Sequence, residues 1–357
     1  EQGAMSSAFT FTITNMGGQA SGALTATLTG TGANQFALSA NGCTAALAGM
    51  ASCTVAVRFA PTTSGAKSAT LTVTGTPGGS VTASVNGMAL APASLTIAPA
   101  AQNFGDVVVG GTASVTLMVT NPGGVASGTP TAGITGTHAA DFTITSNTCS
   151  AAVAPAGNCA ITVRFAPGAT AARMGTLTIS ATPGGSTTAM LSGNGLAPSN
   201  LAISPNMRDY GSIVVGGMSS TMSMSVTNNG GAATGMLTSA LSGGSAAEFT
   251  ITADTCAGQT LAAAATCTVT VQFRPAAPPS AKSASLTVSG TPGGAVAAQL
   301  NGVALAPAQL SLTPSSPNFG SVVAGSSGSP TTLTVTNTGG VATGAITAMR
   351  GGVDMSD

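Results

Sequence analysis

Six cysteines are the residues of this chain whose type and spacing could do chemistry. They form three pairs separated by 10 or 11 positions, and the first two pairs lie 106 residues apart (149 − 43 = 106). No pair has the Cys-x-x-Cys spacing of a zinc site, and the single histidine has no ligand-like residues near it. The spacing predicts no metal site, no cofactor and three disulfides: Cys43–Cys53, Cys149–Cys159 and Cys256–Cys267.

A cysteine pair in every full repeat indicates an oxidising compartment, because cytosolic proteins keep their thiols reduced. We therefore expect a secreted or cell-surface protein. Each disulfide would close a short loop and stabilise its domain by about 3 kcal/mol in the chain-entropy model. That contribution matters because aromatic residues make up only 3% of the chain and tryptophan is absent. No apolar run approaches the roughly 20 residues that span a bilayer, so we expect no membrane span in this sequence.

His138, Asp141 and the many serines raise the question of a hydrolase triad. The histidine occurs in one repeat only, and Gly32 and Ser245 lie at or next to its aligned positions in the other repeats. No Gly-x-Ser-x-Gly elbow leads from a predicted strand into a helix. The acidic residues are too scattered for a calcium loop. We therefore predict no catalytic residues and no enzyme activity.

A basic residue recurs at one position of each full repeat, and a polar or acidic residue recurs at another. The basic set is Lys67, Arg173 and Lys282, and the second set is Gln35, Asp141, Glu248 and Asp357. Some surface arrays carry isopeptide crosslinks between lysine and asparagine or aspartate. Arg173 cannot form such a bond, and Gln35 cannot assist one as an acid. We instead predict exposed polar contacts worth well under about 1 kcal/mol.

Strands must position the cysteines, because the second cysteine of each pair opens an alternating segment. The three copies read CTVAVRFAP, CAITVRFAP and CTVTVQFRP and start at Cys53, Cys159 and Cys267. In the second copy Ile161 and Val163 fall on one face, and polar or small residues fall on the other. This alternation is typical of a half-buried β-strand.

The complete repeat shows seven or eight such strands, turn signals every 8 to 12 residues or so, and no helical periodicity. We predict an all-β fold of tandem immunoglobulin-like β-sandwich domains of seven to eight strands, each with one disulfide. Short joints that contain proline, such as 194–198, predict semi-rigid contacts and an extended rod. The predicted domains are 1–90, which lacks its first strands, 91–196, 197–304, and 305–357, the N-terminal part of a fourth repeat.

The incomplete first and last repeats allow two interpretations. The last repeat could supply the missing strands to the first repeat of another molecule, although it would also bring duplicate strands. A window cut from a longer array is the simpler interpretation.

Charged residues make up only 4% of the chain, and eight basic residues balance eight acidic ones. This balance excludes the basic patch of a nucleic-acid-binding protein. Near-zero net charge favours self-association or packing against neighbouring copies. Arg58 and Arg164 lie on the predicted outer face, where Gln272 replaces them in the third repeat. A glycan or partner contact is one interpretation of these arginines, and a solvated edge or an interdomain contact, which we favour, is the other.

Several landmarks recur in a fixed order. The order is Phe-Gly-x-Val-x-Val-Gly, Val-Thr-Asn-x-Gly-Gly, Asp/Glu-Phe-x-Ile, the two cysteines, and Val-x-Phe-x-Pro. The first landmark stands at Phe104–Gly110, at Tyr210–Gly216 and, with Ala324 departing, at Phe319–Gly325. This order resembles the bacterial choice-of-anchor D domain, a relative of the abnormal-spindle and Hydin-type immunoglobulin-like domains with the major sperm protein fold.

The resemblance covers essentially the whole chain. It implies a large bacterial protein, secreted or anchored to the cell surface, with many tandem copies and no catalytic residues. We therefore predict a non-enzymatic extracellular structural protein whose array forms a surface fibre, a filament or an adhesin stalk. The alternative is a binding module that recognises a glycan or a partner protein through its loops. Its discriminating feature would be exposed aromatic residues, but the chain has one tyrosine and no tryptophan.

Overall fold

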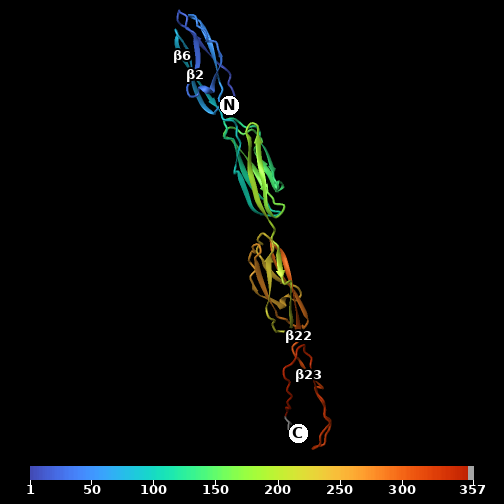
Figure 1. Cartoon of the computed structure of the whole chain (residues 1–357). Helices are drawn as coiled ribbons and strands as arrows, with labels where there is room; N and C mark the ends of the chain where they lie inside the picture. Colours follow the sequence, from blue (N-terminus) through green and yellow to red (C-terminus); the bar gives the residue numbers. More distant parts are fainter. Residues whose placement is uncertain (353–357) are drawn as a thin grey trace. The chain divides into compact units, whose positions relative to one another are not determined.

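A computed structural model describes residues 1–352 of the chain. The fold is all-β, with tandem immunoglobulin-like sandwiches and three short 3-10 turns. Contacts divide the chain into two units, Glu1–Gly195 and Leu196–Asp357. Each sheet is built from strands of a single repeat, as the sequence colouring shows (Figure 1). None of the helical turns in the described part is long and apolar enough to cross a membrane.

The second repeat contains eight strands in two sheets, ordered β11-β12-β9-β7 and β10-β13-β14-β8. A 3-10 turn, η2 (Ala139–Asp141), precedes β11. The strands are β7 (Thr96–Ala98), β8 (Ala101–Val108), β9 (Ala113–Thr120), β10 (Thr131–Thr135), β11 (Phe142–Asn147), β12 (Asn158–Phe165), β13 (Ala171–Ala181) and β14 (Gly185–Leu196).

The third repeat has the same two sheets, ordered β15-β17-β20-β19 and β16-β22-β21-β18. The edge strand β16 runs parallel to β22, whereas the other pairs are antiparallel. The 3-10 turn is η3 (Ala246–Glu248). The strands are β15 (Leu201–Ser204), β16 (Met207–Val214), β17 (Met222–Asn228), β18 (Thr238–Ser242), β19 (Phe249–Asp254), β20 (Thr266–Phe273), β21 (Ala281–Gly290) and β22 (Gly294–Leu305).

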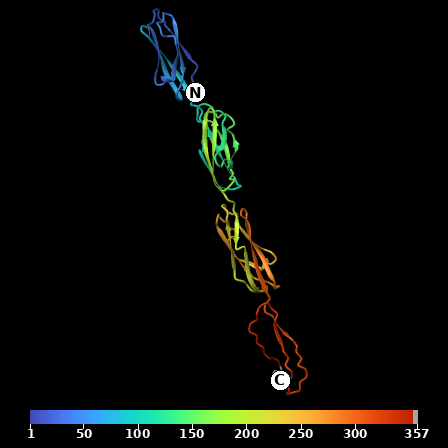
Figure 2. The same cartoon turned by 45° about the vertical axis from the view of Figure 1, so that its right-hand side comes forward.

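The first repeat has six strands among the described residues, ordered β1-β4-β3 and β2-β5-β6, without counterparts of β7 and β8. Its 3-10 turn is η1 (Ala33–Gln35). The strands are β1 (Phe9–Thr14), β2 (Leu24–Thr29), β3 (Phe36–Asn41), β4 (Ser52–Phe59), β5 (Gly65–Gly75) and β6 (Gly79–Ala89). The described part of the fourth repeat forms one strand pair, β23 (Leu310–Thr313) with β24 (Thr334–Asn337), and Figure 2 draws its remainder without strands.

Alternation along the strands explains the two-layer arrangement. In β12, Ile161, Val163 and Phe165 are fully buried, while Arg164 between the last two is exposed. Leu177 and Ile179 of the opposite sheet meet them in one core. Met224 of β17 is also fully buried in the core of the third repeat. Burial of a large aliphatic side chain contributes about 1.5–3 kcal/mol, so these alternating positions define the sandwich.

A trio of aromatic rings compensates for the scarcity of large side chains in the second repeat. Phe142 and Phe165 stack with their centroids 4.9 Å apart. Phe104, from β8, lies 5.7 Å from both rings. Tyr210 occupies the corresponding place in the third repeat, beside Phe249. The aromatic residue of the Phe-Gly landmark therefore closes the core from the edge strand.

A Thr-Pro-Gly-Gly hairpin, which starts at Thr182, joins β13 to β14 in the second repeat. The Thr182–Pro183 peptide bond is cis, and both Gly184 and Gly185 have positive φ, at 135° and 73°. Two consecutive residues with positive φ favour glycine, which accounts for the paired glycines of this turn.

Candidate functional site

The three cysteine pairs are joined as disulfides. Their Cα–Cα distances are 5.3 Å in the first repeat and 5.1 Å in the second and third. Each bond ties the loop after one strand to the start of the central strand of the same sheet, for example the loop after β11 to β12. Cys43, Cys149 and Cys256 are essentially inaccessible to solvent. The disulfides are therefore structural ties within each domain.

The predicted polar contacts are ion pairs in two repeats, and they are less exposed than expected. Lys282 Nζ lies 2.6 Å from Glu248 Oε1, and these side chains are only 7% and 14% exposed. Arg173 Nε lies 3.5 Å from an oxygen of Asp141, and both side chains are 14% exposed. The expectation of exposed contacts was wrong because the loop after the central strand folds over each pair: Glu248 Oε2, for example, accepts the Ala276 amide.

The first repeat has an uncharged version of this contact. Gln35 Oε1 accepts the amide of Thr62, and Lys67 donates to the Thr63 hydroxyl instead of to an acid. Asp357 lies outside the described residues. These positions thus fasten a loop in the first three repeats, through an ion pair in the second and third and without an acid in the first.

His138 and Asp141 are not arranged for proton transfer. His138 Nδ1 accepts a hydrogen bond from the Met174 amide at 3.2 Å. Asp141 is engaged by Arg173 and by the Gly168 amide. Within residues 1–352, no group of three or more His, Cys, Asp or Glu residues could hold a metal ion.

The outer-face residues also lack a common site. Arg58 and Arg164 are exposed, as the strand pattern predicts. Gln272 is partly buried and donates to the Ser219 carbonyl, which belongs to its own repeat. Tyr210 points inward, and its hydroxyl donates to the Val271 carbonyl at 3.1 Å. Burial raises the pKa of Tyr210 to about 12, and nearby Arg208 opposes this rise.

A buried asparagine, which sequence reasoning missed, connects the elements of the second and third repeats. Asn121 is fully buried, and its Oδ1 accepts the amides of Ser94 and Gly123. Its Nδ2 donates to the carbonyls of Val125 and Val153. Asn228 makes the equivalent bonds in the third repeat. The Val-Thr-Asn-x-Gly-Gly landmark was the available signal, because a polar residue at the end of an apolar strand requires partners when buried.

The joints between repeats are bound by the turn that follows this asparagine. The Gly124 amide donates to the Ala91 carbonyl at 2.9 Å. The same bond joins Gly231 to Ala197 and Gly340 to Ala306, at 3.2 and 3.1 Å. A Cβ at the preceding glycine of the second repeat, Gly123, would lie 2.2 Å from the Pro92 carbonyl oxygen. Glycine at this turn therefore allows each joint to pack against the repeat that follows it in the sequence.

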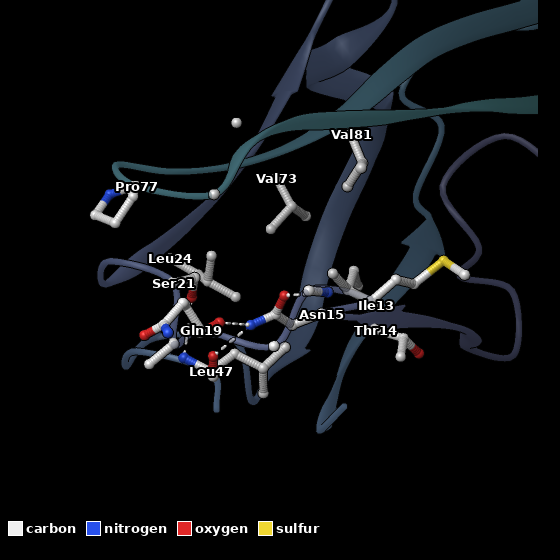
Figure 3. Close-up of a pocket in the computed structure, with 16 residues that line it drawn as sticks. Ile13, Thr14, Asn15, Gln19, Ser21, Leu24, Leu47, Val73, Pro77 and Val81 are labelled. Carbon is white, nitrogen blue, oxygen red and sulfur yellow. Dashed lines mark hydrogen bonds between the residues drawn. The ribbon is translucent and has the colours of Figure 1, made fainter. Parts of the chain in front are cut away.

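The first repeat has an open groove between its two sheets. One hollow of about 610 Å³ lies beside the free edge of β1, where Ile13, Val73 and Val81 surround it and Asn15 lies at its base (Figure 3). A second hollow of about 380 Å³ is lined by Phe9 and by Phe36 of β3 and Phe59 of β4, whose rings are tilted against each other with centroids 5.0 Å apart. Phe9 is 67% exposed, an unusual value for a large ring in an inward strand register.

Comparison with solved structures finds weak similarity to chains of several cadherin or titin domains. Extracellular cadherin domains 1–4 of protocadherin gamma B7 share 9% identity, over 71% of this chain and 62% of theirs, with a TM-score of 0.41. The chain thus spans less than two thirds of that protocadherin. Titin domains I67–I69 share 10% identity over 84% of this chain and 93% of theirs, with a TM-score of 0.30.

Domains EC22–24 of mouse cadherin-23 share 12% identity over 80% of this chain and 86% of theirs, with a TM-score of 0.39. Identities and scores this low carry no argument about family or function. No protein-family model and no curated protein matches the chain.

Proposed function

We propose that this chain is a structural, non-enzymatic part of an extracellular bacterial protein, in which choice-of-anchor D-like domains form a fibre, a filament or an adhesin stalk. The observation that carries the proposal is the docked joint. Three successive Ala-Pro joints are each hydrogen-bonded to the same turn of the repeat that follows. Because the same hydrogen bond recurs at each joint, repeats can be added in series with one type of joint contact.

Disulfides and low charge support the extracellular and self-associating parts of the proposal. All six cysteines are paired, which suits an oxidising compartment. Equal numbers of acidic and basic residues leave little electrostatic repulsion between neighbouring copies. The positions that could do chemistry change from repeat to repeat, whereas the disulfide, the asparagine and the joint recur in the full repeats. This contrast favours a role for the scaffold itself.

Electron microscopy of native material, with mass analysis under non-reducing and reducing conditions, tests this proposal. We expect filaments or stalks with a repeat that matches one or several domains. On reduction, the mass should rise by two hydrogen atoms for each of the three disulfides. Solution scattering from a compact monomer, with no filaments in native material, would refute it.

A further inference from the structure

The two sheets of the second repeat present different outer faces to solvent. Arg164 is exposed on the outer face of the sheet that contains β12. In the other sheet, Arg173 is the only charged residue of β10, β13 and β14, all of which the structure describes. Its side chain lies in the covered ion pair with Asp141 and not on the outer face. The second sheet is thus uncharged across three of its four strands.

Hydroxyl groups cover this uncharged side. Leu177 and Ile179 of β13 point into the core, so the residues between them point outward. The strand register places the outward residues in rows, with Thr178 opposite Thr188 and Ser180 opposite Ser186. We call the outward side of β10, β13 and β14 the hydroxyl face, after its exposed or half-buried residues Thr135, Thr176, Thr178, Ser180, Ser186 and Thr188.

Toward one end of the hydroxyl face, two protruding methionines stand beside an apolar hollow of about 400 Å³. Met174 and Met190 are 58% and 64% exposed and lie on neighbouring strands. Residues 101–103 of the edge strand β8 form the far wall, and Gly136 lies on the opposite side. All four strands of the sheet are present around the hollow. The surface therefore carries both a protrusion and a recess of apolar character.

The uncharged face recurs in the first and third repeats. Thr27 is opposite Thr72 in the first repeat, and Thr238 is opposite Ser289 in the third. The corresponding strands β2, β5, β6, β18, β21 and β22 are fully described, and Lys67 and Lys282 are their only charged residues. The alternation of β5 and β21 places both lysines in the inward register. The absence of charge is thus a property of this sheet in each of the three repeats.

The chemistry of the hydroxyl face identifies its partner. A serine or threonine hydroxyl donates one hydrogen bond and accepts two, so a surface of hydroxyls is complementary to another surface of the same kind. A surface of like charges would instead repel its own copy. Removal of water from neutral hydroxyls also costs less than removal of water from charges. A second copy of this chain carries the matching surface.

The sheet is also large enough for a weak contact. β13 has 11 residues, and four strands of about this length cover an area of about 35 by 20 Å, or about 700 Å². Each partner of a standard protein interface buries about 800 Å². One hydroxyl face therefore lies near the lower limit for a specific contact.

We propose that the hydroxyl face of the second repeat packs on the same face of a second copy. The contact is isologous, so Met190 of each copy enters the hollow of the other, and the hydroxyl rows meet between them. The inference deepens the proposed self-association and rests on that proposed function. It names the surface through which the arrays associate.

Sedimentation equilibrium of the whole chain tests the proposal with one added charge. Thr188 is exposed in a middle strand of the face, so Thr188→Lys leaves the core intact and places like charges in the contact. The dissociation constant should rise at least about tenfold. Thr116→Lys is the matched control, because Thr116 is exposed in a middle strand of the other sheet of the same repeat. This variant should associate like the unaltered chain.

An equal mixture of Thr188→Lys and Thr188→Glu separates a contact between like faces from a contact between the two sheets. Each variant alone should associate weakly, and the mixture should form mixed pairs at least as tightly as the unaltered chain pairs with itself. If the hydroxyl face instead bound the face that carries Arg164, Thr188→Glu alone would associate more tightly and mixing would add nothing. That result would overturn the proposal.

The remaining outcomes separate this contact from the proposed fibre. Association that Thr188→Lys leaves unchanged, or that Thr116→Lys weakens equally, would overturn the contact and leave the fibre standing. A chain that is monomeric at all concentrations would also overturn the contact. Electron microscopy of native material then decides independently whether the fibre proposal fails as well.

Discussion

Replacement of Asn121 by alanine should lower the free energy of unfolding of the second repeat by about 4 kcal/mol. The side chain is fully buried and makes four hydrogen bonds to backbone groups that are 2.8 to 3.1 Å long, and a longer fifth one, of 3.4 Å, to the Ala154 carbonyl. Each such bond contributes about 1 kcal/mol net, and a buried backbone group that loses its partner costs about 1–3 kcal/mol. A loss of this size is a large part of the roughly 5–15 kcal/mol that stabilises a domain.

Hydrogen exchange of the full chain, followed by mass spectrometry, measures this effect repeat by repeat. Because about 1.4 kcal/mol corresponds to a factor of ten, the slowest amides of β9 and β12 should exchange roughly a thousandfold faster. The third repeat provides an internal reference. The control is Asn103→Ala, which removes one bond at an exposed side chain. A change below about 1 kcal/mol, or one equal to that of the control, would refute the central role of Asn121.

Three further changes have defined expectations. Replacement of Cys149 and Cys159 by serine should destabilise the second repeat by about 3 kcal/mol, measured by calorimetry. Gly193→Ala should cost about 1–3 kcal/mol, because its new Cβ would lie 2.5 Å from the Phe165 ring. Above pH 10 the third repeat should lose stability, by up to about 1.4 kcal/mol per pH unit until about pH 12. The folded state holds the Tyr210 phenol protonated to about pH 12, whereas the unfolded state loses this proton near the ordinary value of 10.0.

Each of these three predictions has a control that tests whether the disulfide, the ring contact or the phenol is responsible for the effect. A reducing agent should lower the stability of the unaltered second repeat and leave that of the serine variant unchanged. Gly133→Ala places a Cβ with nothing within 4 Å and should cost almost nothing, so an equal cost at both glycines would argue against the ring contact. Tyr210→Phe should flatten the alkaline profile, and a slope that persists would assign it to another group.

Alternation and turn residues were sufficient to predict the all-β fold and the tandem sandwiches, because side chains in a strand alternate between faces. The segment at Cys159 illustrates this: its inward residues are the fully buried ones. The environment of the polar residues could not be predicted this way. Lys282 and Glu248 lie on separate elements, and the loop that covers them is a feature of tertiary packing.

The buried role of Asn121 could not be predicted from the sequence for a related reason. The landmark that contains Asn121 was visible, but turn chemistry explains an asparagine before two glycines equally well. Only the positions of Ser94 and Val153, which lie 27 and 32 residues away, show that one amide group connects the joint, the strand end and the cysteine loop. Partners this distant in sequence leave no local pattern.

The disulfides have a consequence for chains that are pulled from their ends. Cys149 and Cys159 are only 10 positions apart, so their bond shields a small part of a 106-residue repeat (149 − 43 = 106) from extension. An extended chain spans about 3.3–3.6 Å per residue, so a repeat that unravels would still release about 300 Å of contour. The loop closed by the disulfide would stay intact at the start of β12, and the strand could pair again from there when the tension falls. Such an array could lengthen under load, one repeat at a time, without breaking a covalent bond.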